Sequence, residues 1–292
     1  MKIINFGSLN IDYVYSVDHL VLPGETLASQ DMQVFPGGKG LNQSIAIARA
    51  GGNVSHAGMY AEEGTFLYDI LKKNNVDVSA LKKVNAPNGH AIIEVNKQGE
   101  NSIILFGGTN ELIDRKFVDS VFENVESESI LLIQNEISSI GYIIEKAKEA
   151  KCRIVFNPAP MNDLVFDYPL ELVDTFVVNL TEGQMMSGKN EPKEILSVLN
   201  YKYPNAKVIL TLGSKGSYYS FKNEQSFIKT SKVKNVIDTT AAGDTFIGYY
   251  LAGISDGQSD ITALEVASIA AAKSVQKKGA SVSIPFASEL TE

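Results

Sequence analysis

The sequence predicts an α/β fold that is doubly wound, with a mainly parallel central sheet flanked by helices. Two observations lead to this prediction. Short apolar runs, which suit strands buried on both faces, alternate with segments whose apolar residues recur at helical spacing. Alternation of this kind is typical of a sheet covered by helices. The strand-like runs are residues 3–6, 130–133, 153–156, 176–178 and 208–210.

Helical spacing is clearest in three segments between these runs. Residues 42–50 carry a helical pattern of small side chains, which two glycines at 51–52 end. Residues 66–71 and 140–147 each place their apolar side chains on one face of a helix. We expect each of these helices to cover one face of the sheet.

A near match to a phosphate-binding P-loop lies at residues 183–190. Asn190 stands where Ser or Thr must hold Mg²⁺, and the loop interior contains two methionines and no glycine. We therefore interpret this stretch as a short helix that ends at Gly188.

Two stretches with strand character have no helix between their strands. They cover about residues 12–36 and 88–107, and the second has a hairpin signal at residues 96–100. We expect them to pair as a small second sheet, inserted into one α/β domain that spans residues 1–292. Placed over the carboxyl ends of the main strands, it would act as a lid that excludes water. Two unrelated surface hairpins are the alternative.

Composition limits the class of protein and its partners. The chain has 292 residues, of which 44% are hydrophobic and 21% charged, with a net charge of −8. Because we find no basic cluster beyond Lys277 and Lys278, a nucleic-acid partner is not expected. Cys152 is the single cysteine, which excludes an intrachain disulfide and suits the reducing cytoplasm. No stretch approaches the roughly 18 apolar residues of a membrane span.

Residues 238–248 carry the strongest functional signal. A β-like segment at 232–237 leads into small residues, and Asp244 follows where a helical pattern begins. Small side chains let N–H groups at a helix start approach an anion, and the helix dipole favours negative charge there. An ionised Asp244 beside such groups could accept the proton of an attacking hydroxyl, as a kinase for a hydroxylated small molecule requires. A helix start merely capped by Asp244 is the alternative.

Two motifs near the N-terminus offer groups that suit a sugar. Asn10 and Asp12 are two positions apart in an extended segment, so they share one side and could bind vicinal hydroxyls. Residues 37–40 read Gly-Gly-Lys-Gly, and glycines let the backbone approach a ligand closely. Lys39 and Asn42 would extend from the same helix start. Turn residues, with a solvated lysine, are the alternative for both motifs.

Taken together, these motifs resemble the ribokinase family of carbohydrate kinases, of the pfkB type. The resemblance rests on Gly-Gly-Lys-Gly-x-Asn-Gln at 37–43, Asn-Pro-Ala-Pro at 157–160 and Asp-Thr-x-Ala-Ala-Gly-Asp-Thr-Phe at 238–246. It implies an enzyme that transfers the γ-phosphoryl group of ATP to the primary hydroxyl of a sugar, with ribose favoured and ribose 5-phosphate as product. Fructose, a deoxy-sugar or a nucleoside are alternative acceptors. A non-catalytic sugar-binding regulator is the remote alternative.

The resemblance also implies a role for each matching residue. Asp244 would be the catalytic base, and the N–H groups of Ala241, Ala242 and Gly243 would stabilise the transferred phosphoryl group. The sugar would contact Asn10, Asp12, Gly38, Lys39, Asn42, Glu136 and Asp244. The nucleotide would contact Asn179, Thr211, Gly213, Gly216, Gly243 and Ser268. The alternatives are a solvated loop carboxylate for Glu136, a helix cap for Asn179, and a hairpin turn for residues 213–216.

Metal ions and self-association complete the expectations that the resemblance implies. Glu182 would act indirectly on a Mg²⁺ ion that bridges the phosphates of ATP, with a helix cap as the alternative. A K⁺ ion would lie beside the phosphoryl site, held mainly by backbone carbonyls. The matching positions are Asp238, Thr240, Ser274, Lys277, Gly279 and Ser283. The outer face of the small sheet needs cover, so we expect a homodimer formed through it. Leu41 stands where the family usually has a small residue, and could tighten the sugar pocket.

Overall fold

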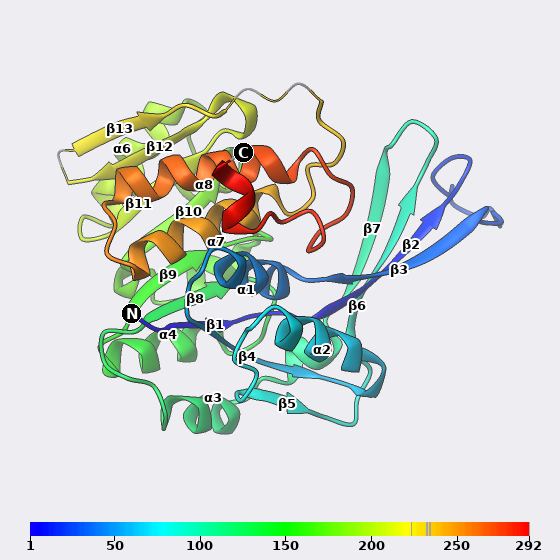
Figure 1. The fold of residues 1–292 in the computed structure, drawn as a ribbon, viewed down its shortest axis with the longest axis horizontal. Coiled ribbons are helices and arrows are strands. Elements are labelled where there is room, and N and C mark those ends of the chain that lie inside the picture. Colours follow the sequence, from blue (N-terminus) through cyan, green and yellow to red (C-terminus); the bar gives the residue numbers. More distant parts are fainter. Residues whose placement is uncertain (223, 232, 234, 292) are drawn as a thin grey trace.

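The structure, a computed structural model, describes residues 1–222, 224–231, 233 and 235–291. Among these residues, nine strands form a large sheet in the order β13-β12-β11-β10-β9-β8-β1-β4-β5 (Figure 1). All neighbouring strands are parallel except for β11, β12 and β13, which pair antiparallel. The bounds are β1 Ile3–Phe6, β4 Val54–Tyr60, β5 Leu81–Lys83, β8 Ile130–Gln134, β9 Arg153–Asn157, β10 Thr175–Asn179, β11 Lys207–Thr211, β12 Ser217–Phe221 and β13 Glu224–Ile228.

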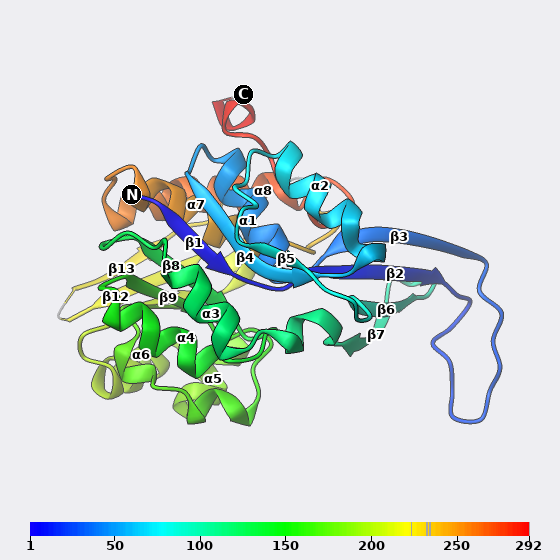
Figure 2. The ribbon, with the colours of Figure 1, turned by 90° about the horizontal axis from the view of Figure 1, so that it is seen from below.

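Helices cover both faces of this sheet (Figure 2). One face carries α1 Lys39–Arg49, α2 Thr65–Lys73, α7 Ala242–Ser255 and α8 Asp260–Ser274. The other carries α3 Arg115–Phe122, α4 Ile140–Glu149, α5 Leu180–Ser187 and α6 Pro192–Lys202. In β8, Ile130 and Leu132 join one apolar core while Leu131 and Ile133 join the other, as the two-residue period of a strand requires. The doubly wound α/β prediction is confirmed.

A small second sheet projects from the body of the molecule, at the right of Figure 1. Its strands are β2 Asn10–Ser16, β3 Asp31–Gly37, β6 Gly89–Val95 and β7 Asn101–Phe106, in the order β3-β2-β6-β7. The two interrupting segments meet where β2 pairs in parallel with β6, which sets Asn10 opposite Gly89. The alternative of two unrelated hairpins is therefore wrong. Antiparallel pairing of β6 with β7 confirms the hairpin signal at residues 96–100.

Several boundaries differ from the sequence expectations. Helix α1 begins at Lys39 rather than at residue 42. Residues 233 and 235–237 form no strand, because Ile237 N–H donates to the Val275 carbonyl at the end of α8 and not to the sheet. Residues 232 and 234, which belong to the expected β-like segment, lie outside the described residues. Short 3₁₀ helices occur at Glu62–Gly64, Gly108–Leu112, Asp163–Asp167, Leu170–Leu172, Gly213–Lys215 and Ala287–Thr291.

Helices α1 and α7 pack unusually close together. A Cβ added at Gly248 would lie 2.3 Å from the Cβ of Ala46, so a larger residue in α7 would push the helices apart. This packing brings the start of α1 to the start of α7. Of the helices in the described part of the chain, none combines the length and apolar character needed to cross a lipid bilayer.

Candidate active site

A cavity of about 460 Å³ lies where the parallel strands of the large sheet end. Asn157, Asn179 and Thr211 are the last residues of β9, β10 and β11, and all three line it. Open α/β sheets bind ligands at this edge, because the strand ends and the loops that follow converge there. The small sheet contributes an apolar part of the wall, formed by Ala91, Ile93, Ile103 and Leu105.

The residues expected to bind a sugar meet in this cavity, although they come from distant parts of the chain. Strand β2, helix α1, the loop after β8 and helix α7 each supply some of them. All seven line the cavity: Asn10, Asp12, Gly38, Lys39, Asn42, Glu136 and Asp244. The carboxylate near the start of α7 and the glycine-rich start of α1 therefore face one shared space.

Glycines let α1 begin directly against the end of β1. Gly38 has a φ of 95°, which favours glycine, and a Cβ there would lie 3.0 Å from the Ser8 carbonyl oxygen. A Cβ at Gly40 would lie 2.5 Å from the Cα of Gly7. The Ser8 carbonyl then accepts the N–H of Leu41 at 3.0 Å. The glycine motif thus serves close backbone packing, which places the following side chains at the cavity.

Leu41 does not tighten this cavity. It is fully buried in the apolar core and is absent from the residues that line the cavity in the described part of the chain. The bulkier side chain points into the protein interior, so the expectation that it reshapes the sugar pocket was wrong.

Glu136 is held at the cavity by two hydrogen bonds. Its Oε2 accepts the backbone N–H of Lys39 at 2.9 Å and the hydroxyl of Ser8 at 2.5 Å. Burial raises the pKa of Glu136, while the positive charge of Lys39 acts in the opposite direction. These contacts differ from those of a solvated loop carboxylate, and they fix Glu136 beside the start of α1.

Asp12 lies near Glu136, in a space that is open because residue 37 is a glycine. A Cβ at Gly37 would fall 2.1 Å from Oδ2 of Asp12. Burial, with a further contribution from the charge of Glu136, raises the pKa of Asp12 from 3.8 to about 7. Asp12 can therefore exchange a proton near neutral pH, and both forms of the carboxyl group can bond sugar hydroxyls.

Asp244 occupies the first turn of α7 and is 8% exposed. Its Oδ2 accepts a hydrogen bond from Nδ2 of Asn42 at 3.0 Å, and its Oδ1 accepts one from Nε2 of Gln43 at 2.9 Å. The other amide atom of Asn42, Oδ1, is buried and has no hydrogen-bond partner among the described residues. The hydrogen bond to Asp244 therefore turns the NH₂ group of Asn42 toward the carboxylate, although its oxygen is left without a donor in the described structure.

The backbone before Asp244 partly matches the expected set of N–H donors. Ala241 adopts a left-handed conformation with φ of 61°, and both Ala241 and Gly243 line the cavity. Ala242 does not line it, and its N–H donates to the Thr239 carbonyl at 3.2 Å. The structure therefore differs from the expectation at Ala242, because the tight turn before α7 uses that group.

Lys39 supplies positive charge to the cavity. Its burial lowers the pKa of the ammonium group, but Asp244, Glu136 and Glu182 together outweigh this effect and raise it. Lys39 therefore stays protonated across the neutral range. A protonated amine in this position can neutralise a phosphate or bond sugar oxygens.

The expected nucleotide residues separate into two groups. Asn179, Thr211 and Gly243 line the main cavity, and a neighbouring cavity of about 380 Å³ adds Gly213 to Asn179 and Thr211. The remaining two, Gly216 and Ser268, line neither cavity.

The positions of Gly216 and Ser268 in the fold explain why neither lines these two cavities. Gly216 closes the turn between β11 and β12, since Leu212 N–H donates to its carbonyl at 2.8 Å and a Cβ there would lie 2.3 Å from Ile228 O. Ser268 is 6% exposed in the middle of α8. In the described structure, neither therefore reaches these two spaces.

Glu182 and Asn179 form a reciprocal cap at the start of α5. Asn179 N–H donates to Glu182 Oε2, and Glu182 N–H donates to Asn179 Oδ1, both at 2.9 Å. Both residues also line the main cavity, so the cap and a role toward a ligand coexist. Burial raises the pKa of Glu182, which hydrogen bonding from Asn179 and the charge of Lys39 oppose. Within the described residues, no three His, Cys, Asp or Glu side chains form a metal-binding group.

The residues matched to a K⁺ site lie on two segments that the fold joins. Asp238 accepts the N–H groups of Thr240 and Gly279, each at 2.9 Å. Although burial acts in the opposite direction, these hydrogen bonds hold the pKa of Asp238 below its usual value. The Ser274 carbonyl accepts Lys277 N–H at 3.2 Å, and Ser283 Oγ donates to the Ala280 carbonyl. Of this set, only Thr240 lines the main cavity.

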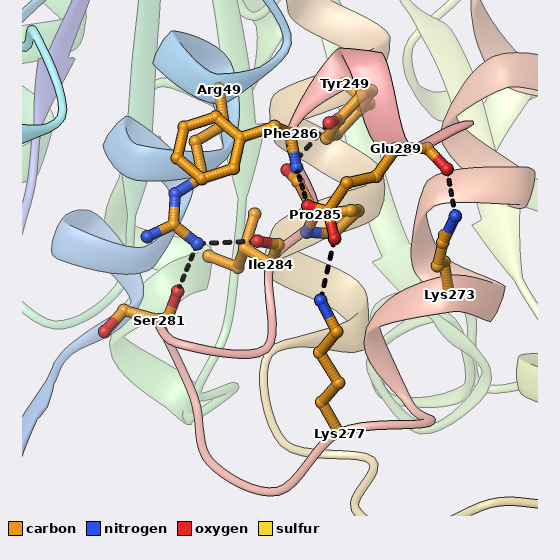
Figure 3. Close-up of polar contacts among 9 residues, drawn as sticks. All are labelled: Arg49, Tyr249, Lys273, Lys277, Ser281, Ile284, Pro285, Phe286 and Glu289. Carbon is orange, nitrogen blue, oxygen red and sulfur yellow. Dashed lines mark hydrogen bonds and ion pairs between the residues drawn. The ribbon is translucent and has the colours of Figure 1, made fainter. Parts of the chain in front are cut away.

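Arg49, at the end of α1, fixes the loop that contains Gly279 and Ser283 (Figure 3). Its Nη1 donates to the carbonyls of Ser281 at 2.9 Å and Ile284 at 2.5 Å, and its guanidinium lies 4.7 Å from the ring centre of Phe286. The contact explains how α1 can contribute residues to the cavity at its start and hold this loop at its end.

The C-terminal turn is anchored on α8 close to the same loop. Glu289 pairs with Lys277 at 2.8 Å and accepts the N–H of Phe286 at 2.6 Å (Figure 3). The side chain of Lys277 is therefore engaged by Glu289, and only its backbone carbonyl could take part in the K⁺ site.

The structure adds site residues for which the sequence suggested no role. Gln43 contacts Asp244, and Asn110 donates to Asn10 Oδ1 at 2.7 Å, which turns the Asn10 NH₂ group toward other partners. Gln43 stands next to Asn42 in the glycine-rich motif, which was the available signal. Asn110 has no comparable signal, because it lies in a short 3₁₀ helix far from the motifs.

Comparison with known proteins agrees with this geometry. Residues 1–287 match the family described as pfkB family carbohydrate kinase. The ribokinase of Staphylococcus aureus (strain COL) is 34% identical over 302 residues, covering 100% of this chain and 99% of the relative. The ribokinase of Haemophilus influenzae is 35% identical, covering 98% and 96%. The structure of Arabidopsis thaliana ribokinase with ribose and ATP superposes with a TM-score of 0.89, at 27% identity, covering 99% and 97%.

Proposed function

Because the chain belongs to the pfkB family of carbohydrate kinases, we propose that it transfers the γ-phosphoryl group of ATP to the primary hydroxyl of ribose. The products are ribose 5-phosphate and ADP. The observation that carries the proposal is the shared cavity, in which Asp244 faces the six other residues suited to a sugar. The names of the relatives support ribose as the acceptor, and the chemistry of the cavity supports phosphoryl transfer.

Asp244 acts as the base in this reaction. As the sugar oxygen bonds the γ-phosphorus, the hydroxyl proton passes to the Asp244 carboxylate, and the bond from phosphorus to the β,γ-bridging oxygen breaks. The transition state of such transfers is loose, so alignment and charge neutralisation contribute more than base strength. The start of α7, with Ala241 and Gly243 at the cavity, supplies N–H dipoles toward the transferred group. Lys39 adds a fixed positive charge.

Polar side chains of the cavity bind the sugar hydroxyls, and apolar side chains of the small sheet cover the sugar. The NH₂ group of Asn10 donates to one hydroxyl, Asp12 bonds a second hydroxyl, and Asn42 lines the same cavity. The small sheet acts as the lid, since its apolar residues face the cavity and exclude water from the reaction.

Mg²⁺ fits the donors that the cavity offers. Glu182 and Asn179 provide oxygen atoms at the cavity but do not form a complete set of Mg²⁺ ligands. This arrangement suits Mg²⁺, because the ion usually keeps several water ligands and binds phosphate oxygens. When bound, the ion would neutralise charge on the phosphates of ATP. Glu182 would hold its water shell rather than the ion itself.

A K⁺ site is a further part of the proposal. Asp238 joins residues 238–240 to the loop around Gly279, which brings carbonyl-rich backbone from both segments together next to Thr240. Hard oxygen donors of this kind suit K⁺, whose charge would polarise the N–H groups at the start of α7. The readout is a change of melting temperature with K⁺ relative to Na⁺ at equal ionic strength.

We also propose that the reaction takes place in the cytoplasm. We further propose that two copies of the protein associate through the outer faces of their small sheets. Strand alternation turns apolar residues away from the cavity, and Ile92, Ile104 and Phe106 are 38%, 66% and 47% exposed. Such a row of exposed apolar side chains favours burial against a second copy. Light scattering should give the mass of a dimer, and Ile104→Glu should give a monomer. A wild-type monomer across micromolar concentrations would contradict the dimer.

An assay with a panel of acceptors tests the proposed function. Ribose, fructose, deoxyribose and nucleosides are each incubated with ATP and Mg²⁺, and ADP and the phosphorylated product are measured. We expect the highest kcat/KM for ribose, with phosphorus attached to the primary hydroxyl. Preference for another acceptor would contradict the assignment of ribose as the substrate. Sugar binding without ADP formation would favour the alternative of a non-catalytic sugar-binding regulator.

A further inference from the structure

A chain of buried polar side chains lies behind Asp244. Gln43 donates to Asp244 Oδ1 at 2.9 Å, and its Oε1 accepts Nε2 of Gln134 at 2.7 Å. Gln134 also donates to Asn5 Oδ1 at 2.9 Å. Gln43, Gln134 and Asn5 are at most 1% exposed and are not among the residues that line the cavity in the described structure. They can affect a bound ligand only through Asp244 or its neighbours.

Donor and acceptor chemistry fixes the direction of the amide groups of Asn5, Gln134 and Gln43. Asn5 Nδ2 donates to the Gly40 carbonyl, which can only accept, so Asn5 Oδ1 must face Gln134. The NH₂ group of Gln134 therefore points at both Asn5 and Gln43, and the oxygen of Gln43 must accept from it. The NH₂ group of Gln43 is consequently directed at Asp244, and a reversed amide would set oxygen against oxygen.

We propose that Gln43 is a positioning residue for the base, and that Gln134 fixes the direction of its amide. Gln43 and Asn42 each donate to one oxygen of Asp244, which sets the rotation of the carboxylate toward the cavity. Of these two donors, Asn42 lines the cavity and Gln43 does not. This inference rests on the proposed function, because it assigns Gln43 to the base of that reaction.

The contacts of Gln43 exceed what packing alone requires. Its Nε2 also lies 3.2 Å from Asn157 Oδ1, and Asn157 Nδ2 donates to the Val177 carbonyl. Gln43 is thus braced by a second strand end, at the same edge of the sheet as the cavity. Loss of its NH₂ group would leave Asp244 Oδ1 without this donor, and the carboxylate could rotate away from the acceptor hydroxyl.

Three variants test the proposal with ribose and ATP. Gln43→Met keeps the length of the side chain and removes its donor, and Gln134→Met removes the group that orients Gln43. Tyr250→Phe is the matched control, since it removes a buried hydrogen bond to Asp260 Oδ1 of 2.7 Å from the same helix as Asp244. The kcat, the KM for ribose and the melting temperature are measured for each.

We expect Gln43→Met to lower kcat by at least about 10-fold, with the KM for ribose changed by less than about 3-fold. Gln134→Met should lower kcat less, by about 3-fold or more, in the same pattern. Tyr250→Phe should lower the melting temperature and leave kcat and the KM for ribose unchanged.

The proposal is overturned if Gln43→Met keeps the wild-type kcat, or if its loss of kcat only parallels the loss of stability that Tyr250→Phe also shows. Should Gln43→Met fail to fold, Gln134→Met decides by the same criteria. A wild-type protein that phosphorylates no sugar would overturn the proposed function instead, and is recognised before any variant is compared.

Discussion

Oδ2 of Asp244 accepts a hydrogen bond from Nδ2 of Asn42 at 3.0 Å, across 202 positions of sequence. This bond joins α1, which carries the glycine-rich motif, to α7, which carries the proposed base. Gly248 makes it possible, because it lets α7 pack directly on Ala46 of α1. The fold therefore holds the proposed base against the start of α1 through helix packing.

Gly37→Ala should weaken sugar binding. The added Cβ would lie 2.1 Å from Asp12 Oδ2, so the carboxylate must leave its place at the cavity. We expect the KM for ribose to rise by about 10-fold or more, as is typical when a charged hydrogen-bond partner is displaced. Gly141→Ala is the control, since the nearest atom to its Cβ is at 3.6 Å, an ordinary contact. An unchanged KM in Gly37→Ala would contradict the placement of Asp12.

Asp12→Asn should change how stability depends on pH. The native pKa of Asp12, about 7, lies above the ordinary value of 3.8, so between these two pH values the native state holds a proton that the unfolded chain has lost. Stability from this group is present below about pH 4 and is lost as pH rises through about 7. We expect Asp12→Asn to be more stable than wild type at about pH 8, by roughly 2–4 kcal/mol, and equally stable near pH 4.

Denaturant unfolding of the ligand-free protein at several pH values measures this difference. Comparison of the two proteins cancels the opposite contribution of His56, whose pKa burial lowers to about 4. A difference in the free energy of unfolding that stays constant with pH would show that Asp12 is not buried in this way.

Arg49→Met should loosen the loop around Gly279 and Ser283. Two carbonyls lose their donor and Phe286 loses the guanidinium above its ring. We expect the free energy of unfolding to fall by about 1–3 kcal/mol. Arg115→Met is the control, because exposed Arg115 also lies 4.7 Å from a ring, that of Tyr142, and should cost less than about 1 kcal/mol. Equal losses in both variants would remove the special role of Arg49.

Much of the fold and the cavity could be predicted from the sequence. The continuous apolar run from Ile130 to Ile133 is visible in the sequence, because a strand that is buried on both faces needs apolar side chains on both. The expected sugar residues converge because most of them follow a strand or open a helix at one edge of the large sheet, and β2, which carries Asn10 and Asp12, begins at the same edge. Local patterns of this kind determine where elements begin, and the parallel sheet brings their ends together.

Other features depend on packing that no local pattern reveals. The contact of Gln43 with Asp244 requires the close approach of α1 and α7, and that of Gln134 requires the register of β8. The use of Ala242 N–H within its own turn follows from the left-handed Ala241, a conformation that is rare for alanine. Gly216 resembles a ligand-contacting glycine in sequence, yet the nearby backbone of Ile228 explains it.

Replacement of Asp244 by Asn tests the central assignment most directly. The variant keeps the size of the side chain and one acceptor for Asn42 or Gln43, while Asn10, Asp12 and Lys39 still bind the sugar. Calorimetry should give dissociation constants for ribose and ATP within about 5-fold of wild type, while kcat falls by about 100- to 10,000-fold. A folded Asp244→Asn protein that retains kcat within about 10-fold of wild type would show that another group accepts the hydroxyl proton.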